Sequence, residues 1–363
     1  MKIHFIISSI GHGGAERVLV LMANNLAKNP NNEISVITLF NKKDNYELNP
    51  SIKRESLKGS PYIPSHTLRS IINLSRFYKT RTNRPNIIIS FITLTNLICI
   101  IVAKLFKIKI IAQEHNSYLR YMKGRKLITK LTKEYVYKKA DLVTVLTSFD
   151  LPYYTKFGVN VRVMPNPCTF KPIKDNSHRR DNTILAVGHL DRYHHKGFDN
   201  LIKLIAPLLI ANPEWKLKIA GYGSIGLEYL SKLVKQYNLE NQVLFLGFVD
   251  NVSELMQKSS IFILSSRYEG LPMVLLEAMS QGMACISYNC KTGPSDIIEH
   301  DVNGFLIDDQ DSLKMQEKLD ELINNENLRK QLSNEAIKSL DKFHISNITK
   351  KYQDLFNKLL LEK

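Results

Sequence analysis

Hydrophobic positions along the chain form short runs that alternate with longer stretches in which apolar residues recur at helical spacing. Such an alternation is typical of parallel strands that are covered by helices. The pattern occurs twice, so we predict two α/β domains, each built on a doubly wound parallel sheet. The predicted strands are residues 3–9, 33–39, 86–91, 109–113 and 142–146 in the first half and residues 183–188, 216–220, 243–247, 261–265 and 284–287 in the second half.

A polar segment separates the two series of strands. Residues 168–182, CTFKPIKDNSHRRDN, contain a proline and no apolar periodicity, as expected of a linker. With 363 residues, of which 44% are hydrophobic, the chain has more apolar side chains than one core usually supports. We therefore predict domains at residues 1–170 and 171–363. The last segment, residues 345–363, forms an apolar helical stripe that either domain can bury.

The uncharged run of residues 87–103 approaches the length that spans a bilayer. Polar side chains interrupt it at Ser90, Thr93, Thr95 and Asn96. Its first half is β-branched and its second half has helical composition, so we favour a buried strand and a buried helix over a membrane span. The N-terminal apolar run leads into glycines without a cleavage site, so we interpret it as the first strand and not as a signal peptide.

Composition excludes several classes of protein. Charged residues make up 23% of the chain and aromatic residues 9%, which is typical of a soluble globular protein and not of a collagen-like or low-complexity one. Of the four cysteines, only Cys285 and Cys290 lie near each other, and their spacing is not that of a metal site. We therefore expect a reducing compartment, the cytoplasm.

Positive charge is concentrated in the first half of the chain. Residues 1–180 hold 30 Lys and Arg against 10 Asp and Glu, whereas residues 181–363 hold 20 against 24. The excess is densest in residues 61–140, with 16 basic and 2 acidic side chains. Such an asymmetry indicates an anionic partner for the first domain.

Two loops after predicted strands carry groups that suit a phosphate. Gly11, Gly13 and Gly14 precede a helix, where backbone N–H groups can face an anion or a sugar. A tight turn without a ligand would need the same glycines. In the second half, Arg192 and Lys196 precede a helix, where two cations can neutralise a diphosphate leaving group without a metal ion. A solvated basic loop is the alternative.

A third loop combines two carboxylates with a helix N-terminus. Glu269 and Gly270 follow a strand, and Pro272 can begin the next helix, which places Glu277 about one and a half turns into it. Acidic residues can simply complement the helix dipole. The helix amides also suit a phosphate, and carboxylates accept hydrogen bonds from ribose and sugar hydroxyls. We therefore predict a nucleotide-sugar site.

These segments, in their order along the chain, resemble family 4 of the retaining glycosyltransferases. The resemblance covers nearly the whole chain and is carried by GGAERV, GHLDRYHHKGFDNLI, FLGFVDNV, EGLPMVLLEAMSQGMACIS and TGPSDIIEHDVNGFLI. It implies the GT-B fold, in which two Rossmann-like domains face each other across a cleft. Within the family, the sequence looks most like bacterial enzymes that build polysaccharides or glycan precursors on a polyprenyl diphosphate lipid.

The resemblance also implies a role for each site residue. Glu277 would bind the ribose, Glu269 the donor sugar, and Arg192 and Lys196 the diphosphate. His115 would line the site from the first domain, although by its residue type alone it can equally be a core histidine with satisfied hydrogen bonds. The other donor-binding residues implied by the resemblance are Gly14, Gly247, Phe248, Val249, Gly270, Leu271, Pro272 and Met273.

Two possible metal sites are weak. Asp309 and Asp311 form a D-x-D motif, but they precede an amphipathic helix, where acidic residues serve as caps. His194 and His195 have no third ligand at a suitable spacing. We therefore expect no essential metal and no cofactor, since the nucleotide sugar, UDP-linked by the resemblance, is a substrate.

The basic first domain contains a candidate membrane contact at residues 119–139. We predict a helix there with an apolar face formed by Leu127, Ile128, Leu131 and Tyr135. Its basic face would consist of Lys123, Lys126, Lys130 and Lys133. This pattern is typical of a helix that lies on an anionic membrane, and a solvated face over an ordinary core is the alternative. We favour a peripheral protein on the cytoplasmic leaflet.

The resemblance as a whole implies a retaining transferase that moves a hexose or an N-acetylhexosamine from a nucleotide sugar to a polyprenyl diphosphate-linked saccharide. A sugar-nucleotide epimerase or hydrolase of the same fold is one alternative, but it would need no acceptor and no basic face. A nucleic-acid-binding protein would explain the basic half. The sequence has no recognisable binding motif for it, so we expect no nucleic-acid partner.

Overall fold

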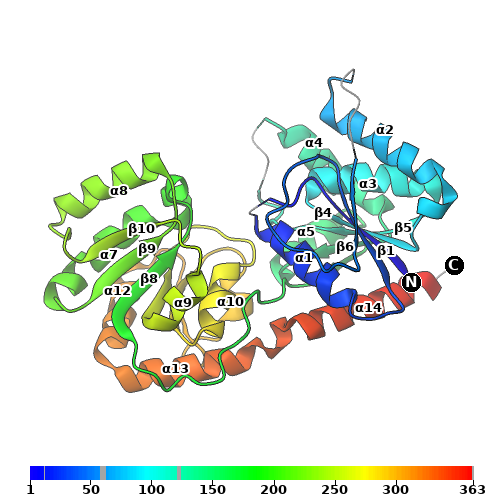
Figure 1. The fold of residues 1–363 in the computed structure, drawn as a ribbon. Coiled ribbons are helices and arrows are strands. Elements are labelled where there is room, and N and C mark those ends of the chain that lie inside the picture. Colours follow the sequence, from blue (N-terminus) through cyan, green and yellow to red (C-terminus); the bar gives the residue numbers. More distant parts are fainter. Residues whose placement is uncertain (12, 58–62, 121–123, 362–363) are drawn as a thin grey trace. The chain divides into compact units, whose positions relative to one another are not determined.

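The structure is a computed structural model, and it describes residues 1–11, 13–57, 63–120 and 124–361. The chain forms two compact units, which Figure 1 shows as ribbons. Unit 1 consists of Met1–Thr169 and Phe343–Lys363, and unit 2 consists of Phe170–Lys342. The chain therefore leaves unit 1 once and returns to it at its C-terminal end.

Unit 1 is built on a seven-stranded sheet with the order β3-β2-β1-β4-β5-β6-β7. All neighbouring strands in it are parallel. The strands near its centre are buried along their length, which explains why they read as almost continuous apolar runs. The strands are β1 (Lys2–Ile7), β2 (Glu33–Thr38), β3 (Lys53–Ser56), β4 (Ile87–Phe91), β5 (Lys109–Gln113), β6 (Leu142–Val145) and β7 (Val161–Val163).

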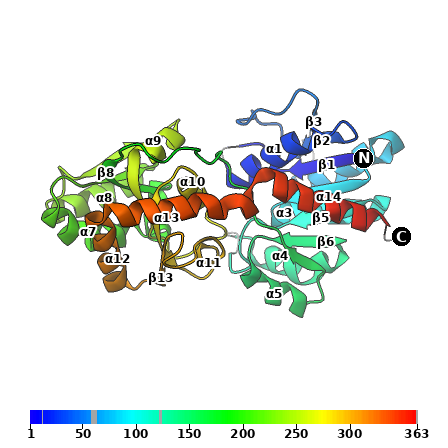
Figure 2. The same cartoon turned by 90° about the horizontal axis from the view of Figure 1, so that it is seen from below.

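Helices cover both faces of this sheet. On one face, α2 (His66–Lys79), α3 (Thr93–Phe106) and α5 (Leu151–Lys156) share a hydrophobic cluster with strand residues such as Ile88. A short helix, α4 (Lys126–Leu131), precedes β6. On the other face, α1 (Gly14–Leu26) and α14 (Ile345–Leu361) lie side by side (Figure 2). Unit 1 is thus a sheet between two helical layers, as predicted.

The C-terminal helix α14 belongs to unit 1. Its Thr349 hydroxyl accepts a hydrogen bond from Asn25 Nδ2 of α1 at 2.7 Å, and its Tyr352 hydroxyl lies 3.5 Å from Thr144 Oγ1 of β6. The apolar stripe seen in the sequence is buried by these contacts. Unit 2 therefore ends at Lys342, and the final helix packs on unit 1, which is one of the two placements that its apolar stripe allowed.

Unit 2 is built on a six-stranded parallel sheet with the order β10-β9-β8-β11-β12-β13. Its strands are β8 (Asp181–Val187), β9 (Lys216–Ala220), β10 (Val243–Gly247), β11 (Ser259–Leu264), β12 (Ala284–Asn289) and β13 (Phe305–Asp308). The helices are α6 (Tyr193–Lys196), α7 (Phe198–Ala211), α8 (Ser224–Gln236), α9 (Val252–Lys258), α10 (Met273–Ser280), α11 (Pro294–Ile297), α12 (Ser312–Asn324) and α13 (Glu326–Ser339).

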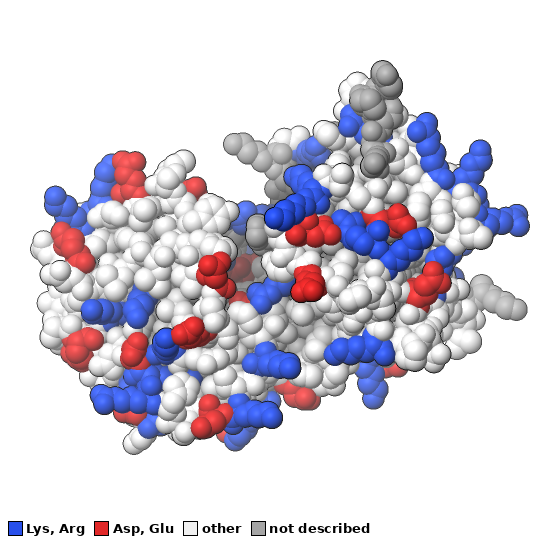
Figure 3. Space-filling view, viewed as in Figure 1, with Lys and Arg blue, Asp and Glu red and all other residues white. Residues whose placement is uncertain are grey.

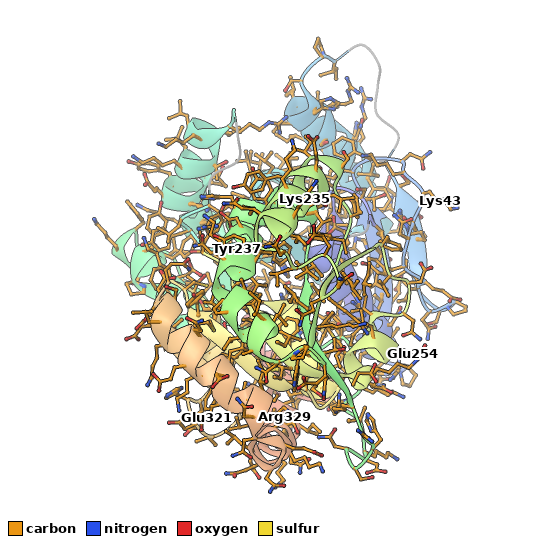
Figure 4. All side chains as sticks on the ribbon, turned by 90° about the vertical axis from the view of Figure 1, so that its left-hand side faces the viewer. Lys43, Lys235, Tyr237, Glu254, Glu321 and Arg329 are labelled. Atoms are coloured by element: carbon orange, nitrogen blue, oxygen red, sulfur yellow. The ribbon has the colours of Figure 1, made fainter. Side chains whose placement is uncertain are left out.

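The side chain of one arginine connects the last two helices of unit 2 by a hydrogen bond. Arg329, near the start of α13, donates a hydrogen bond to the carbonyl of Ile323 in α12 at 2.9 Å. Its guanidinium lies 5.2 Å from the centre of the Trp215 ring, and Figure 4 places the residue on the outer surface of unit 2. One face of the sheet and the helices α7, α8, α12 and α13 enclose a hydrophobic core.

The structure confirms every predicted strand and adds short edge strands, β3, β7 and β13. The uncharged run at residues 87–103 is β4 followed by α3, as predicted, with Ile92 at a φ of 73° between them. Within the described residues, no helix is long and apolar enough to span a bilayer. Cys99, Cys285 and Cys290 are buried as free thiols.

Candidate active site

The loops after β8 and β11 bring two predicted catalytic residues into contact. Because β8 and β11 are neighbours in a parallel sheet, their carboxyl ends open at the same edge, where α/β proteins bind ligands. There, Lys196 Nζ lies 2.8 Å from Glu269 Oε1. The Ser266 hydroxyl donates to the same carboxylate oxygen at 2.6 Å. Both charged side chains are largely buried, which strengthens their attraction.

The charge state of Glu269 follows from these contacts. Burial on its own would raise the pKa of Glu269, but the positive charge of Lys196 and the hydrogen bonds from Lys196 and Ser266 lower that pKa below its usual value. Glu269 is therefore ionised at neutral pH. An ionised carboxylate only accepts hydrogen bonds, as a group that binds sugar hydroxyls must.

A second ion pair connects the loop after β11 to the start of α7. Arg267 donates to Asp199 with both terminal nitrogens, Nη1 to Oδ1 at 2.8 Å and Nη2 to Oδ2 at 3.0 Å. Its backbone N–H donates to the carbonyl of His195 at 3.0 Å. The rings of His195 and Tyr268 stack with their centroids 3.9 Å apart. Sequence reasoning missed Asp199 and Arg267, whose only signal was their nearness to Lys196 and Glu269 along the chain.

Glycines allow these loops to approach one another closely. Gly197 has a φ of +68°, and a Cβ added there would lie 1.9 Å from the carbonyl oxygen of Ser265. Gly293 has a φ of +95°, and a Cβ there would lie 2.0 Å from the carbonyl oxygen of Gly270. A side chain at Gly197 would separate the loops that carry Lys196 and Glu269, and one at Gly293 would separate the Glu269 loop from the loop before α11.

Arg192 lies at the exposed rim of this loop cluster, in the turn Leu190–Arg192. Its charge is close enough to His195 to lower the pKa of that imidazole, although burial is the larger cause. The preceding residue, Asp191, fixes the turn because its Oδ1 accepts a hydrogen bond from Gly226 N of α8 at 2.9 Å. Sequence reasoning did not single out Asp191.

The helix α10 begins one residue later than predicted, at Met273, with Pro272 as the residue that precedes it. Leu271 and Glu277 are buried. Glu277 lies on α10, so its carboxyl is fixed by a helix whose N-terminus follows the Glu269 loop. Gly270 packs against the loop before α11, where the Thr292 hydroxyl donates to the carbonyl of Glu269.

The loop of Gly247, Phe248 and Val249, to which the resemblance assigns donor binding, follows β10. Gly247 ends this strand with a φ of +66°, and its carbonyl accepts a hydrogen bond from Gly221 N after β9 at 2.8 Å. Phe248 is 66% exposed, and Val249 is half-buried. Since β10, β9 and β8 are consecutive in the sheet, this loop lies at the same edge as Lys196. An exposed ring at this place can stack on a base.

In unit 1, His115 follows β5 and is held by its neighbours. Its ring stacks on Phe91 with the centroids 4.9 Å apart, and its Nε2 donates to Gln113 Oε1 at 3.2 Å. Its Nδ1 is buried and has no hydrogen-bond partner within the described part of the chain. Burial lowers the pKa of His115 to about 3. His115 is therefore a neutral imidazole at physiological pH.

Gly14 lies on the same edge of the unit 1 sheet, as the first residue of α1. A Cβ added at Gly14 would meet no described atom within 4 Å. Packing therefore does not require glycine here, and the helix N-terminus is open to a close approach by a ligand.

The predicted membrane segment differs from expectation. It is not one regular helix, because α4 ends at Leu131 and a wider π-helical turn, Thr132–Val136, follows. The turn rotates Lys133 inward, where it is fully buried and its Nζ donates to the carbonyls of Tyr118 and Arg120 at 3.2 Å each. The prediction of Lys133 as a surface residue was wrong.

The remaining residues of that segment do form a basic surface with exposed apolar side chains. Lys126 and Lys130 are exposed, and Lys123 lies outside the described residues. Leu127, Leu131 and Tyr135 are 70%, 45% and 57% exposed. Ile128, the fourth residue of the predicted apolar face, is half-buried.

Asp311 has the capping role that the sequence suggested. Its Oδ1 accepts a hydrogen bond from Lys314 N at 3.0 Å at the start of α12. The first acidic residue of the D-x-D motif, Asp309, accepts from the side chain of Gln310 at 3.1 Å.

Comparisons with known proteins identify both units. The family described as Glycosyltransferase Family 4 matches residues 12–169, and that described as Glycosyl transferases group 1 matches residues 170–339. The chain is 33% identical, over 98% of both chains, to the GalNAc-alpha-(1->4)-GalNAc-alpha-(1->3)-diNAcBac-PP-undecaprenol alpha-1,4-N-acetyl-D-galactosaminyltransferase of Campylobacter jejuni. It is 30% identical to the amylovoran biosynthesis glycosyltransferase AmsD of Erwinia amylovora, over 98% of this chain and 99% of AmsD.

Solved structures share the fold of the whole chain. The sucrose-phosphate synthase of Thermosynechococcus elongatus superimposes with a TM-score of 0.80 at 20% identity, over 100% of both chains. The lipopolysaccharide outer core galactosyltransferase WaaB superimposes with a TM-score of 0.76 at 23% identity, over 99% of this chain and 100% of WaaB. At these identities the likeness establishes the fold.

Proposed function

The chain belongs to glycosyltransferase family 4 and is a glycosyltransferase of the GT-B fold, and from this premise we propose that it transfers an N-acetylhexosamine or a hexose from a UDP-sugar to a polyprenyl diphosphate-linked saccharide. The proposed binding of a nucleotide-sugar donor rests on the buried contact between Lys196 and Glu269. The acceptor half is supported by the relative in Campylobacter jejuni, whose name specifies an undecaprenol diphosphate-linked acceptor.

The donor is held by unit 2. Arg192 and Lys196 bind the diphosphate, and the ionised Glu269 accepts hydrogen bonds from the hydroxyls of the donor sugar. Lys196 can bridge its partner Glu269 and a phosphate oxygen, because an ammonium group has three N–H donors. Glu277 binds the ribose, and Phe248 faces the base. The positive charge of Arg192 and Lys196 takes the place of a metal ion.

The reaction retains the anomeric configuration by a front-face route. The bond between the anomeric carbon and the diphosphate oxygen breaks as the acceptor oxygen approaches on the same face. The acceptor hydroxyl gives its proton to the departing phosphate oxygen. Lys196 and Arg192 stabilise the negative charge on that phosphate. His115 is neutral, so it can act through hydrogen bonds but not as an acid.

Unit 1 places the acceptor at an anionic membrane surface. Support comes from the outer side of the helical layer formed by α2, α3 and α4. Leu68, Leu105 and Leu127 are exposed there. The sequence has no acidic residue between positions 56 and 113, where nine basic residues occur. Figure 3 shows Lys and Arg side chains projecting from the part of unit 1 that carries α2.

An apolar groove adds to this surface. It has a volume of about 450 Å³ and runs between α2 and α3, with a lining of Ile71, Ile72, Ser75, Arg76, Lys79, Leu105 and Phe106. Apolar side chains flanked by cations are the combination that binds an anionic bilayer, since the side chains enter the headgroup region and the cations meet the lipid phosphates. The protein is thus proposed to be a peripheral membrane protein of the cytoplasmic leaflet.

The test is turnover of a panel of UDP- and GDP-sugars in the presence of EDTA, with and without a polyprenyl diphosphate-linked saccharide. We expect release of UDP from one donor only when the acceptor is present. Equal release without the acceptor would instead indicate a nucleotide-sugar hydrolase. Loss of turnover in EDTA with recovery on addition of Mn²⁺ would contradict the role given to Arg192 and Lys196.

A further inference from the structure

We propose that Asp150 and Lys133 are positioning residues that hold the loop of residues 114–120 and thereby set the position of His115. This inference rests on the proposed function, because the loop is assigned to the site through His115. Both charged side chains lie inside unit 1, with exposures of 3% for Asp150 and 0% for Lys133. We refer to residues 114–120 as the β5 loop, since they follow β5 directly.

Asp150 binds the β5 loop through its carboxylate. Oδ1 accepts hydrogen bonds from the Ser117 hydroxyl at 2.9 Å and from the backbone N–H of Tyr118 at 2.8 Å. Oδ2 accepts from the Thr147 hydroxyl at 3.2 Å. Since Asp150 and Thr147 follow β6, which is the neighbour of β5, the carboxylate ties the loop to the next strand of the sheet.

Lys133 binds the same loop with a positive charge, whereas Asp150 binds it with a negative one. Its Nζ donates to the carbonyls of Tyr118 and Arg120, each at 3.2 Å. The peptide groups around Tyr118 are therefore held at both ends, the N–H by a carboxylate and the C=O by an ammonium group. Hydrogen bonds to charged groups are stronger than those between neutral groups, so this part of the backbone is held firmly.

A third buried ionisable group, Glu114, completes the arrangement. Its carboxylate accepts a hydrogen bond from the Tyr137 hydroxyl. Burial raises the pKa of Glu114 and that of Asp150, and the charge of Lys133 opposes both changes. Burial lowers the pKa of Lys133, and the two carboxyl groups oppose that change. The charge of Lys133 is therefore coupled to those of Glu114 and Asp150.

Stability of the fold alone does not account for this cluster. Buried charges cost desolvation energy, and apolar residues of similar size often stabilise a core equally well or better. The backbone groups of Tyr118 and Arg120 that form hydrogen bonds with Asp150 and Lys133 belong to the β5 loop, which also carries His115. A neutral imidazole acts only through directional hydrogen bonds, and a displacement of about 1 Å can reduce a rate by about 100-fold. The cluster supplies the fixed backbone that such a group needs.

The variants Asp150→Asn and Ser117→Ala test the proposal in the full-length protein. The first removes the negative charge of Asp150. The second removes the hydrogen bond from the Ser117 hydroxyl without changing any buried charge. Asp141→Asn is the matched control. Asp141 precedes β6, and its Oδ2 accepts a hydrogen bond from Ile110 N at 2.9 Å, so it binds the opposite end of β5 and does not reach the loop.

Two measurements are required, and one of them is independent of activity. Hydrogen–deuterium exchange of residues 114–120 should quicken in Asp150→Asn and, to a smaller extent, in Ser117→Ala, with no change in Asp141→Asn. With a donor and an acceptor that the wild type uses, kcat should fall at least tenfold in Asp150→Asn, while UDP affinity stays within twofold because unit 2 is unchanged. A general loss of structure would instead lower both kcat and UDP affinity.

Three results would overturn the proposal. One is unchanged exchange of the β5 loop, another is faster exchange with unchanged kcat, and the third is an equal effect in Asp141→Asn. If Asp150→Asn does not fold, Ser117→Ala decides. Faster exchange of the β5 loop together with a lower kcat in Ser117→Ala would support the proposal, and wild-type exchange and kcat would refute it. Failure of the proposed function is distinguishable, since a wild type without transferase activity would leave the exchange result intact.

Discussion

The ammonium group of Lys196 and the carboxylate of Glu269, which come from loops after different strands, lie 2.8 Å apart in the interior of unit 2. Each charge is the main compensation for the burial of the other. Under the proposed function, a diphosphate bound to Lys196 would enter a site in which the carboxylate that accepts the sugar hydroxyls is already in place.

Replacing Lys196 with alanine should reduce turnover much more than it reduces stability. Loss of a group that stabilises a developing charge lowers kcat by about 100-fold or more. The free energy of unfolding should fall by about 1–3 kcal/mol, because Glu269 loses a charged hydrogen-bond partner. Steady-state kinetics and urea denaturation measure the two effects. Lys203→Ala, at an exposed position of α7, is the control, and activity within threefold of wild type in Lys196→Ala would refute the assignment.

The lowered pKa of Glu269 predicts a specific dependence of stability on pH. A carboxyl whose pKa is lower in the folded state stabilises the protein fully above its unfolded pKa of about 4.3. That contribution is lost as the pH falls through the folded pKa. Urea denaturation between pH 7 and the acid range should therefore show a shallower acid loss in Glu269→Gln than in wild type. Parallel curves for the two proteins would mean that the carboxyl is not stabilised by Lys196.

The pair of Arg267 and Asp199 should show a strong coupling energy, since it is bidentate and mostly buried. A double-mutant cycle with Arg267→Lys and Asp199→Asn should give a coupling of about 1–3 kcal/mol in unfolding free energy. The single variants should also raise the KM for the donor, because the pair connects the loop that carries Glu269 to the start of α7, which follows Lys196. Additive effects on stability, with an unchanged KM, would show that the loops are held by other contacts.

Membrane binding should depend on the exposed residues of α4. Replacement of Lys126 and Lys130 with serine should weaken binding to vesicles of phosphatidylglycerol and phosphatidylethanolamine by about 10-fold or more, since each lysine contributes about 1 kcal/mol at an anionic surface. The matched control replaces Lys350 and Lys351, two exposed residues of α14 on the other face of the sheet. Co-sedimentation measures the bound fraction of protein. An equal loss of binding in the α4 and α14 variants would mean that α4 is not a specific membrane contact.

The apolar side chains of the same helix give an independent prediction. Leu127→Ser together with Leu131→Ser should weaken vesicle binding and leave the thermal unfolding midpoint nearly unchanged, because both side chains are exposed. A large fall in the midpoint would mean that these leucines are covered by protein and not by lipid. Differential scanning fluorimetry beside the co-sedimentation assay separates the two results.

The parallel strands were predictable because their apolar runs are almost continuous, as in β4 with every residue buried. The edge strand β3 was not predictable, since it is short, lacks an apolar run and has no fully buried residue. Its structure comes from pairing with β2, which is a tertiary effect. Edge strands of this kind leave little signal in local sequence.

The site was predictable only in part, for a similar reason. Glu269 and Lys196 lie in loops after apolar strands and have residue types that suit a nucleotide sugar. Asp199 and Arg267 have the same surroundings, but ion pairs between loops leave no pattern in the sequence. Lys133 shows the opposite error, because helical periodicity placed it on the surface and the π-helical turn rotated it inward.

The return of the chain to unit 1 through α14 has a consequence for dissecting the molecule. A fragment that stops at Thr169 would leave α1 without the helix that packs against it, and the apolar side chains that Tyr352 and Phe356 cover would face water. Residues 170–342, in contrast, are contiguous and enclose their own core. Truncation or circular permutation should therefore spare unit 2 and fail for unit 1 unless residues 343–363 are joined to it through a new linker.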